Sequence, residues 1–153
     1  MSLTGYEGHP PVRVGSSIGD ITAGLFTVIG IQAALLNKTK RNKGAHIDIS
    51  MLDCQIAILE NAISRFYSEK KIPKKLGSRH PSISPFEAYK CKDDYIVVAA
   101  GNDNLFEQFC DCLNMRLLLN NKYFNKNDKR LKNAEKLKTI IEKVLKKKEL
   151  WHF

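Results

Sequence analysis

The sequence has none of the short motifs that identify common nucleotide-binding and hydrolytic sites. There is no P-loop, no G-x-G-x-x-G dinucleotide fingerprint, no H-E-x-x-H zinc motif and no G-x-S-x-G nucleophile elbow. Each of these motifs places particular groups for one chemistry, such as backbone amides around a phosphate or two histidines on a metal ion. Any catalytic site in this chain must therefore be built from residues without such a signature.

Cysteine is scarce and is not arranged for metal binding. The four cysteines are Cys54, Cys91, Cys110 and Cys112, and the two closest form C-x-C rather than C-x-x-C. Because this spacing does not match a zinc site, we expect no metal. Free thiols are typical of a reducing compartment, and the sequence has no secretory signal pattern. We therefore expect a cytoplasmic protein.

Acidic residues are outnumbered by basic ones, but the excess is local. The net charge is +9, from 25 lysines and arginines against 16 aspartates and glutamates. Residues 116–153 hold twelve of the basic and four of the acidic residues, a net charge of +8. The lysines fall among apolar residues at helical spacing, which favours a solvated helix face over a polyanion-binding surface. Since no nucleic-acid motif accompanies them, we expect no nucleic-acid partner.

One segment, residues 18–36, is apolar enough to raise the question of a membrane span. It contains Asp20 and Gln32, polar residues that are costly inside a bilayer. The overall content of 43% hydrophobic and 27% charged residues is typical of a soluble globular protein. We therefore expect the buried helix of a soluble protein and no membrane partner.

The first half of the chain has mainly helical periodicity. The pattern predicts a helix over residues 19–37 and a short strand over residues 45–50, where polar and apolar residues alternate. Ser50 is a typical N-cap, and Asp53 three residues later resembles the acid of a capping box. A second helix is therefore predicted over residues 51–69.

The second half begins with a loop and changes to strand-like periodicity. Residues 70–85 contain prolines, a glycine and basic residues, which indicates a linker. Two alternating segments, 86–91 and 95–100, flank a short polar turn and predict a β-hairpin. Asp103 is placed to cap the helix that follows, and residues 117–153 are mainly helical. This half is therefore predicted to be an α+β unit.

Asp20 opens the first helix directly after residues 8–17, which are rich in glycine, proline and serine. A helix N-terminus carries partial positive charge and free N–H groups, so it favours an ionised acid. The carboxylate of Asp20 is therefore either a helix cap or a reactive group. Aspartate is common in the first turn of helices, so position alone favours the cap.

A series of short segments points to a known family. The segments are residues 12–15, 19–20, 24–25, 33–35, 43–44, 47–53, 77–86, 93–98 and 100–103, with Arg130 and Trp151 at further matching positions. In this order they resemble class III CoA-transferases, the family that includes formyl-CoA transferase, carnitine CoA-transferase and α-methylacyl-CoA racemase. The resemblance covers nearly the whole chain and is closest to the branch that contains succinate-hydroxymethylglutarate CoA-transferase.

The resemblance implies a fold and a domain organisation. It implies an α/β fold for a whole enzyme and an α+β arrangement for this segment. Residues 1–69 would be a helical part of the large domain, and residues 70–85 a linker with an active-site loop. Residues 86–153 would form a small α+β domain with an antiparallel hairpin.

The resemblance also implies a role for Asp20, which matches the aspartate that the family uses as its nucleophile. An ionised carboxylate attacks an acyl-CoA thioester without a general base. The expected intermediates are a mixed anhydride and then an aspartyl-CoA thioester, so coenzyme A enters as acyl-CoA substrate and a small carboxylic acid is the acceptor. Met51 matches a family position near bound CoA, although a methionine at this place is also a common core residue.

The loop Gly77, Ser78, Arg79 and His80 corresponds to the family's small-residue loop over the active site. Its backbone N–H groups are candidate oxyanion donors or part of a lid, and Arg79 or His80 could pair with a distal carboxylate of the substrate. The alternative is a connection without function. Asp103 matches an acid/base glutamate of the racemase branch, but the residues around it favour an N-cap.

The family's enzymes are much longer than this chain, which begins shortly before Asp20. We therefore expect little transferase activity from this polypeptide alone, whether it is a truncated chain, a split-gene product or a relic. We expect a homo-oligomer, in the family an interlocked dimer, or a companion N-terminal chain. The alternatives are a non-catalytic assembly module and a racemase-like isomerase.

Overall fold

The computed structural model describes residues 1–149, so the predicted match at Trp151 lies outside the described residues. The chain divides into two compact units, Met1–Lys75 and Leu76–Phe153. The first is helical and the second combines helices with a β-hairpin, which confirms the predicted α+β fold class.

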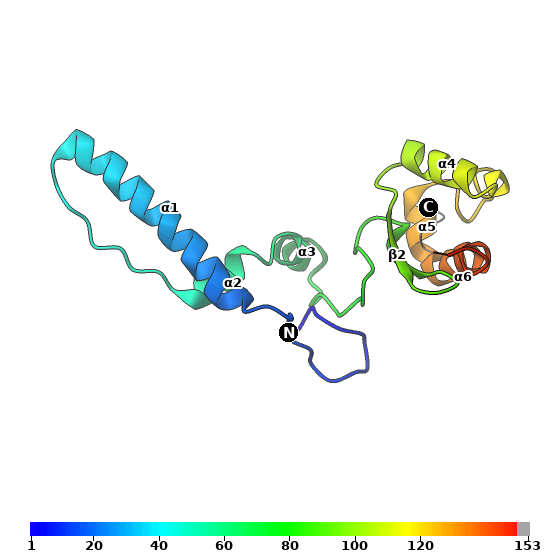
Figure 1. The fold of residues 1–153 in the computed structure, drawn as a ribbon, viewed down its shortest axis with the longest axis horizontal. Coiled ribbons are helices and arrows are strands. Elements are labelled where there is room, and N and C mark those ends of the chain that lie inside the picture. Colours follow the sequence, from blue (N-terminus) through cyan, green and yellow to red (C-terminus); the bar gives the residue numbers. More distant parts are fainter. Residues whose placement is uncertain (150–153) are drawn as a thin grey trace. The chain divides into compact units, whose positions relative to one another are not determined.

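The first unit contains α1 (Ile18–Arg41), α2 (Met51–Ala57) and α3 (Asn61–Glu69), and α2 packs against the N-terminal part of α1 (Figure 1). The first helix is longer than the predicted residues 19–37. It ends at Asn42, which has a φ of 51° and donates its N–H to the Lys38 carbonyl. Basic residues in the last turn favour this extension because they interact with the negative end of the helix dipole.

The predicted strand over residues 45–50 is wrong. This segment is extended but pairs with no strand in the described part of the first unit. Its apolar residues pack on α1 instead: a Cβ placed on Gly30 would lie 3.1 Å from Ile47 Cγ2 and 3.8 Å from Ile49 Cδ1. The alternation of polar and apolar residues therefore arises because one face of this extended segment packs on α1.

The predicted single helix over residues 51–69 is two helices. Its start is confirmed, because the Asp53 N–H donates to Ser50 Oγ at 3.2 Å. The helix then breaks at Glu60, which has a φ of 49° and a ψ of −122°. A left-handed φ at a non-glycine residue is uncommon, and no proline or glycine in the sequence indicates this break.

The second unit contains β1 (Phe86–Lys90), β2 (Tyr95–Ala99), α4 (Asp103–Cys112), the 3-10 helix η1 (Arg116–Leu118), α5 (Asn127–Lys132) and α6 (Ala134–Leu145). The two strands form an antiparallel pair in which Phe86 lies opposite Ala99 and Lys90 lies opposite Tyr95. The hairpin predicted from the alternating segments is thus confirmed.

The core of the second unit is formed by the hairpin, α4, η1 and α6. The buried side chains are Tyr89, Cys91, Ala100, Phe106, Cys110, Leu113, Leu118, Phe124, Leu137, Ile141 and Leu145. On α6 the buried positions recur every three or four residues, while Lys136 and Lys143 are exposed. Lys136 and Lys143 therefore lie on a solvated face, as their spacing predicts, whereas Lys138 pairs with the buried Glu87 at 2.6 Å.

The apolar side chains of α1 are exposed. Thr22 is the one buried residue of this helix. The exposed large apolar side chains are Ile21, Leu25, Val28, Ile29, Ile31, Leu35 and Leu36. Among the described helices, α1 alone has the length and apolar composition needed to cross a membrane, properties that core helices of soluble proteins share. The predicted burial of this helix does not occur within the unit itself.

Candidate functional site

Asp20 lies in the first turn of α1, and its side chain is exposed. The N-cap is Ser17, whose carbonyl accepts the Ile21 N–H at 3.0 Å. No hydrogen bond or ion pair to the Asp20 carboxylate is present among residues 1–149. The capping role favoured by position alone is therefore not the one that the structure shows. The carboxylate is accessible at the positive end of a helix.

Met51, the first residue of α2, lies beside the first turn of α1. A Cβ placed on Gly19 would lie 3.6 Å from Met51 Cε and 4.0 Å from Gln55 Nε2. The side chains of Met51 and Gln55 thus approach the backbone directly before Asp20. Met51, one of the two site residues predicted in the first unit, therefore lies beside the residue that precedes the other one, Asp20.

Two residues that the sequence did not indicate join α1 to α2 at this place. The side-chain amide of Gln55 donates to Thr22 Oγ1 at 2.7 Å, and the Thr22 hydroxyl donates to the Ile18 carbonyl at 2.7 Å. Thr22 is 6% exposed. A threonine and a glutamine 33 positions apart carry no local signal, so only the packing of the two helices could reveal the pair.

The loop that contains Gly77 and Ser78 is attached to the outer edge of β1 in the second unit. Gly77 has a φ of 63° within a β-turn closed by the Arg79 N–H and the Leu76 carbonyl at 3.2 Å. This φ favours glycine at that position. The Ala88 N–H donates to Ser78 Oγ at 3.0 Å. The loop thus covers an edge that would otherwise be unpaired.

Arg79 and His80 are engaged within the second unit. Arg79 Nη1 lies 3.0 Å from Glu135 Oε1, an ion pair whose acidic partner is largely exposed. The His80 N–H donates to the Phe86 carbonyl at 2.8 Å, and the imidazole stacks on the Phe86 ring with centroids 5.0 Å apart. Because His80 Nδ1 accepts the Ser82 N–H, the proton of the neutral ring is on Nε2.

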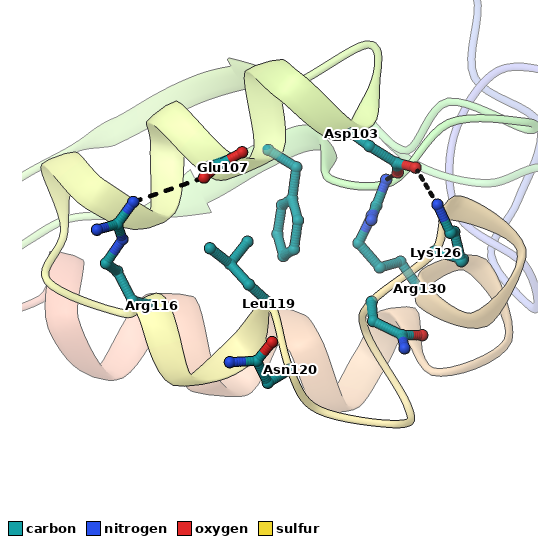
Figure 2. Close-up of a pocket in the computed structure, with 9 residues that line it drawn as sticks. Asp103, Glu107, Arg116, Leu119, Asn120, Lys126 and Arg130 are labelled. Atoms are coloured by element: carbon teal, nitrogen blue, oxygen red, sulfur yellow. Dashed lines mark hydrogen bonds and ion pairs between the residues drawn. The ribbon is translucent and has the colours of Figure 1, made fainter.

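The second unit also contains a polar pocket that the sequence did not reveal, with a volume of about 520 Å³ (Figure 2). Its lining residues are Asp103, Phe106, Glu107, Arg116, Leu119, Asn120, Asn125, Lys126 and Arg130. Figure 2 shows two ion pairs at its rim, one between Arg116 and Glu107 and one between Lys126 and Asp103. Its charged groups therefore largely neutralise one another.

Asp103 is not the N-cap of α4, which corrects the prediction. The cap is the preceding residue, Asn102, whose Oδ1 accepts the Leu105 N–H at 2.8 Å. Asp103 instead pairs with Arg130 Nη2 at 2.8 Å and Lys126 Nζ at 3.3 Å. The hydrogen bond from Arg130 is the main reason that the pKa of Asp103 is below its ordinary value.

Arg130 is a structural residue of the second unit. It is 1% exposed, and its guanidinium donates to the carbonyls of Ser84 at 2.6 Å and Phe124 at 3.1 Å. The same group lies over the ring of Phe106, with 4.3 Å from Cζ to the centroid. A buried arginine is stable only when paired in this way. The arginine noted from the family resemblance thus joins loop, helix and core.

Among the described residues, no group of three or more histidine, cysteine, aspartate or glutamate side chains is arranged to hold a metal ion. All four cysteines are free thiols, of which Cys112 is exposed and the others are buried. In the first unit the candidate site consists of the exposed Asp20 carboxylate, with Met51 beside the preceding residue. A carboxylate is a possible nucleophile in acyl transfer.

Comparison with known proteins gives consistent matches along the chain. The acetyl-CoA:oxalate CoA-transferase of Acetobacter aceti is 37% identical over 154 aligned residues, which span 100% of this chain and 40% of that protein. The succinyl-CoA:glutarate CoA-transferase of Homo sapiens is 37% identical over 141 residues, 92% of this chain and 32% of that protein. The chain thus spans about two fifths or less of these relatives.

Comparison with solved structures gives matches over nearly the whole chain. A CAIB/BAIF family protein from Brucella suis is 34% identical and superposes with a TM-score of 0.75 over 95% of this chain and 39% of that one. Rv3272 from Mycobacterium tuberculosis, at 18% identity, has the same fold with a TM-score of 0.80 over 97% of this chain and 38% of that chain. The sequence matches CoA-transferase family III over residues 1–152. The chain belongs to CoA-transferase family III.

Proposed function

We propose that this chain is the nucleophile-bearing segment of an enzyme that moves CoA from an acyl-CoA to a free carboxylic acid. The observation that carries the proposal is the exposed Asp20 carboxylate at the N-terminus of α1, which no described side chain or amide engages. A carboxylate used only as a cap would hold its own helix amides. An unpartnered carboxylate is available for nucleophilic attack.

The reaction proceeds in balanced acyl-transfer steps. An Asp20 carboxylate oxygen attacks the thioester carbonyl, and collapse of the tetrahedral intermediate expels CoA thiolate and leaves a mixed anhydride. The thiolate then attacks the Asp20 carbonyl, which releases the donor acid and forms an aspartyl-CoA thioester. The acceptor carboxylate attacks this thioester to give a second anhydride and thiolate. Attack of the thiolate on the acceptor carbonyl yields the new acyl-CoA and restores Asp20.

Each tetrahedral intermediate needs hydrogen-bond donors for its oxyanion, and the family resemblance makes the N–H groups of the loop beside β1 the candidates. The N–H groups of Arg79 and His80 already donate to the carbonyls of Leu76 and Phe86. Those of Gly77 and Ser78 have no acceptor among the described residues. We therefore assign oxyanion binding to the Gly77 and Ser78 amides. One such donor contributes about 3 kcal/mol to the transition state in other enzymes.

Substrate contacts follow from the same assignment. Met51 lies against Gly19 and would contact the CoA thiol arm when the thioester reaches Asp20. Arg79 would bind a distal carboxylate of the acid, because its present partner, Glu135, is 83% exposed and holds it only weakly. The relatives named for oxalate and glutarate act on dicarboxylic acids, which supports this class of acceptor.

The chain by itself would have little transferase activity. Large apolar side chains along α1, among them Leu25, Val28 and Leu35, are more than half exposed. An apolar surface of this extent marks an interaction site. We propose that a second copy or a companion N-terminal chain covers it and completes the enzyme, in the cytoplasm. The same surface is the one observation that favours the alternative, a non-catalytic assembly module.

A racemase-like isomerase is less well supported by the second unit. That reaction would use Asp103 as an acid/base group, which must gain and lose a proton near neutral pH. The pairing with Arg130 and Lys126 keeps the pKa of Asp103 below its ordinary value, so the carboxylate stays ionised. Exchange of the α-proton into solvent without an acceptor acid would restore the racemase hypothesis.

The test is to trap the intermediate on Asp20. The chain is assembled with a polypeptide covering the part of the relatives N-terminal to the match, and acetyl-CoA or succinyl-CoA is added with hydroxylamine. We expect a hydroxamate on Asp20 in the mass spectrum of the digested protein, and none in Asp20→Asn. Asp53→Asn, a change at another exposed first-turn aspartate, is the control and keeps the adduct. An adduct at any other residue would contradict the assignment.

A further inference from the structure

We propose that Gln55 is a positioning residue that fixes the first turn of α1, and with it Asp20, by holding the hydroxyl of Thr22. The catalytic part of this inference rests on the proposed function of Asp20. The structural part, a side-chain link between α1 and α2, stands on the contacts themselves. Gln55 and Thr22 would act on Asp20 through the backbone and would not touch the substrate.

The hydroxyl of Thr22 is the centre of the link. Thr22 Oγ1 accepts the Gln55 side-chain amide at 2.7 Å and lies 2.7 Å from the Ile18 carbonyl and 3.1 Å from the Gly19 carbonyl, to which it donates. One hydroxyl thus ties the backbone directly before Asp20 to a side chain of α2. Thr22 is also the one buried residue of α1, and its hydroxyl makes the contact with α2.

The first turn of α1 needs such a link because its other support is weak. The first N–H groups of any helix have no intrahelical acceptor, and a capping side chain usually satisfies one of them. The N-cap Ser17 makes no side-chain hydrogen bond, and Asp20 makes none either. Without Gln55, the turn that carries the nucleophile would fray like other uncapped helix ends.

Gln55 belongs to a helix whose N-terminus is well capped. This helix has a side-chain cap, because Ser50 Oγ accepts the Asp53 N–H. Gln55 follows within the same helix, and its amide nitrogen reaches to within 4.0 Å of the position that a Cβ on Gly19 would occupy. A Cβ at position 19 would be in ordinary van der Waals contact with Met51 and Gln55, so both side chains pack closely beside the residue that precedes Asp20.

The structural part is tested by amide hydrogen exchange on the chain itself. The amides of Ile21 and Thr22 are the first in α1 with helical acceptors, so they report on this turn. Gln55→Leu is expected to speed their exchange about tenfold, because it removes the one hydrogen bond that Thr22 Oγ1 accepts from α2. Gln32→Leu, at an exposed position of the same helix, is the control and leaves their exchange unchanged.

Variants of Thr22 test the same link from the other side, so the result does not depend on whether Gln55→Leu folds. Thr22→Val keeps the branched shape and removes the hydroxyl, so it reproduces the faster exchange, whereas Thr22→Ser keeps the hydroxyl and the wild-type rate. Because Gln55→Leu and Thr22→Val remove the same bond, the double variant exchanges no faster than the faster single one. Equal exchange in wild type and both single variants would overturn the link.

The catalytic part is tested on the assembled enzyme by single-turnover release of CoA from acyl-CoA. Gln55→Leu and Thr22→Val are expected to slow release about tenfold with acyl-CoA affinity unchanged, and Thr22→Ser restores the rate. Faster exchange with unchanged CoA release would overturn the positioning role. If the wild-type assembly forms no Asp20 adduct, the proposed function fails, and the exchange data alone decide whether the Gln55 link exists.

Discussion

Arg130 Nη2 lies 2.8 Å from Asp103 Oδ1, an ion pair in which the arginine is buried and the aspartate is half exposed. This pair joins α5 to the first turn of α4, and the same guanidinium donates to the carbonyls of Ser84 and Phe124. One buried side chain thus links two helices and two loop carbonyls. The stability of the second unit is therefore expected to depend on one buried cation.

Replacement of Arg130 should be strongly destabilising. In Arg130→Leu the carbonyls of Ser84 and Phe124 lose their donor and Asp103 loses its buried partner. We expect the free energy of unfolding to fall by about 3 kcal/mol, measured by urea denaturation followed by circular dichroism. Lys126→Gln is the control, because the exposed ion pair with Asp103 contributes about 0–1 kcal/mol. Equal losses in the two variants would refute the structural role of Arg130.

The second unit should lose stability in acid because the Asp103 carboxylate becomes protonated. The hydrogen bond from Arg130 lowers the pKa of Asp103 in the folded chain below the ordinary value of 3.8. A lowered folded-state pKa contributes stability that is fully present above 3.8 and is lost as the pH falls through the folded-state pKa. Urea midpoints of wild type should therefore drop below that pH.

The matched variants for this pH effect are Asp103→Asn and Asp128→Asn. Asp103→Asn should start from a lower midpoint at neutral pH and show a shallower fall in acid. Asp128, which is exposed in the first turn of α5, should behave like wild type when changed to Asn. An identical acid dependence in all three proteins would show that Asp103 is not the titrating group.

Asp20 and Ser50 should differ in their effect on stability. Ser50 caps α2 through the Asp53 N–H, so Ser50→Ala is expected to cost about 1 kcal/mol. Asp20 has no partner in the described chain, so Asp20→Asn should lose only the interaction with the helix dipole and cost less than Ser50→Ala. A loss as large as that of Ser50→Ala would mean that the carboxylate is a cap after all.

Two glycines of α1 should respond differently to alanine. A Cβ on Gly24 would meet no atom within 4 Å, so Gly24→Ala should stabilise the helix by about 0.5–1 kcal/mol through its helix propensity. A Cβ on Gly30 would lie 3.1 Å from Ile47 Cγ2, so the Ile47 side chain would have to shift by a few tenths of an ångström. Gly30→Ala should therefore give little or no gain in the same urea measurement. A gain equal to that of Gly24→Ala would show that Ile47 does not pack closely on α1.

The apolar surface of α1 should cause self-association of the isolated chain. Leu25 and Leu36 are 60% and 69% exposed, and such side chains rarely remain in contact with water along a whole helix. We expect an oligomer in size-exclusion chromatography with light scattering, and a smaller species in Leu25→Glu. Leu117→Glu, at an 89% exposed position of η1, is the control and should not change the oligomeric state. A monomeric wild-type chain would contradict self-association.

Features with a strong local signal were predictable from the sequence. The hairpin was indicated by alternation on both sides of a polar turn, and the Ser50 cap by the serine before an apolar run. The long α1 was indicated by its continuous apolar run. In each of these cases the residues that determine the structure are close together in the chain, so their pattern can be read without knowledge of the fold.

Features that depend on distant residues were missed or misplaced. The predicted strand at residues 45–50 failed because Ile47 and Ile49 pack on Gly30 of a helix, and alternation does not reveal which kind of element a strand-like face meets. The predicted N-cap of α4 is Asp103, one residue after the observed cap, Asn102. The sequence does not reveal that Asp103 pairs with Arg130. Both errors come from tertiary contacts that override local preference.

The sequence by itself determined the family and the position of Asp20 at the start of an apolar helix, because these depend on residue order. Only the tertiary structure showed that Asp20 has no partner among the described residues, that Gln55 holds Thr22, and that Arg130 is buried against Asp103. The physical reason is that hydrogen bonding and burial depend on groups brought together from distant parts of the chain. Such groups leave no trace in local spacing.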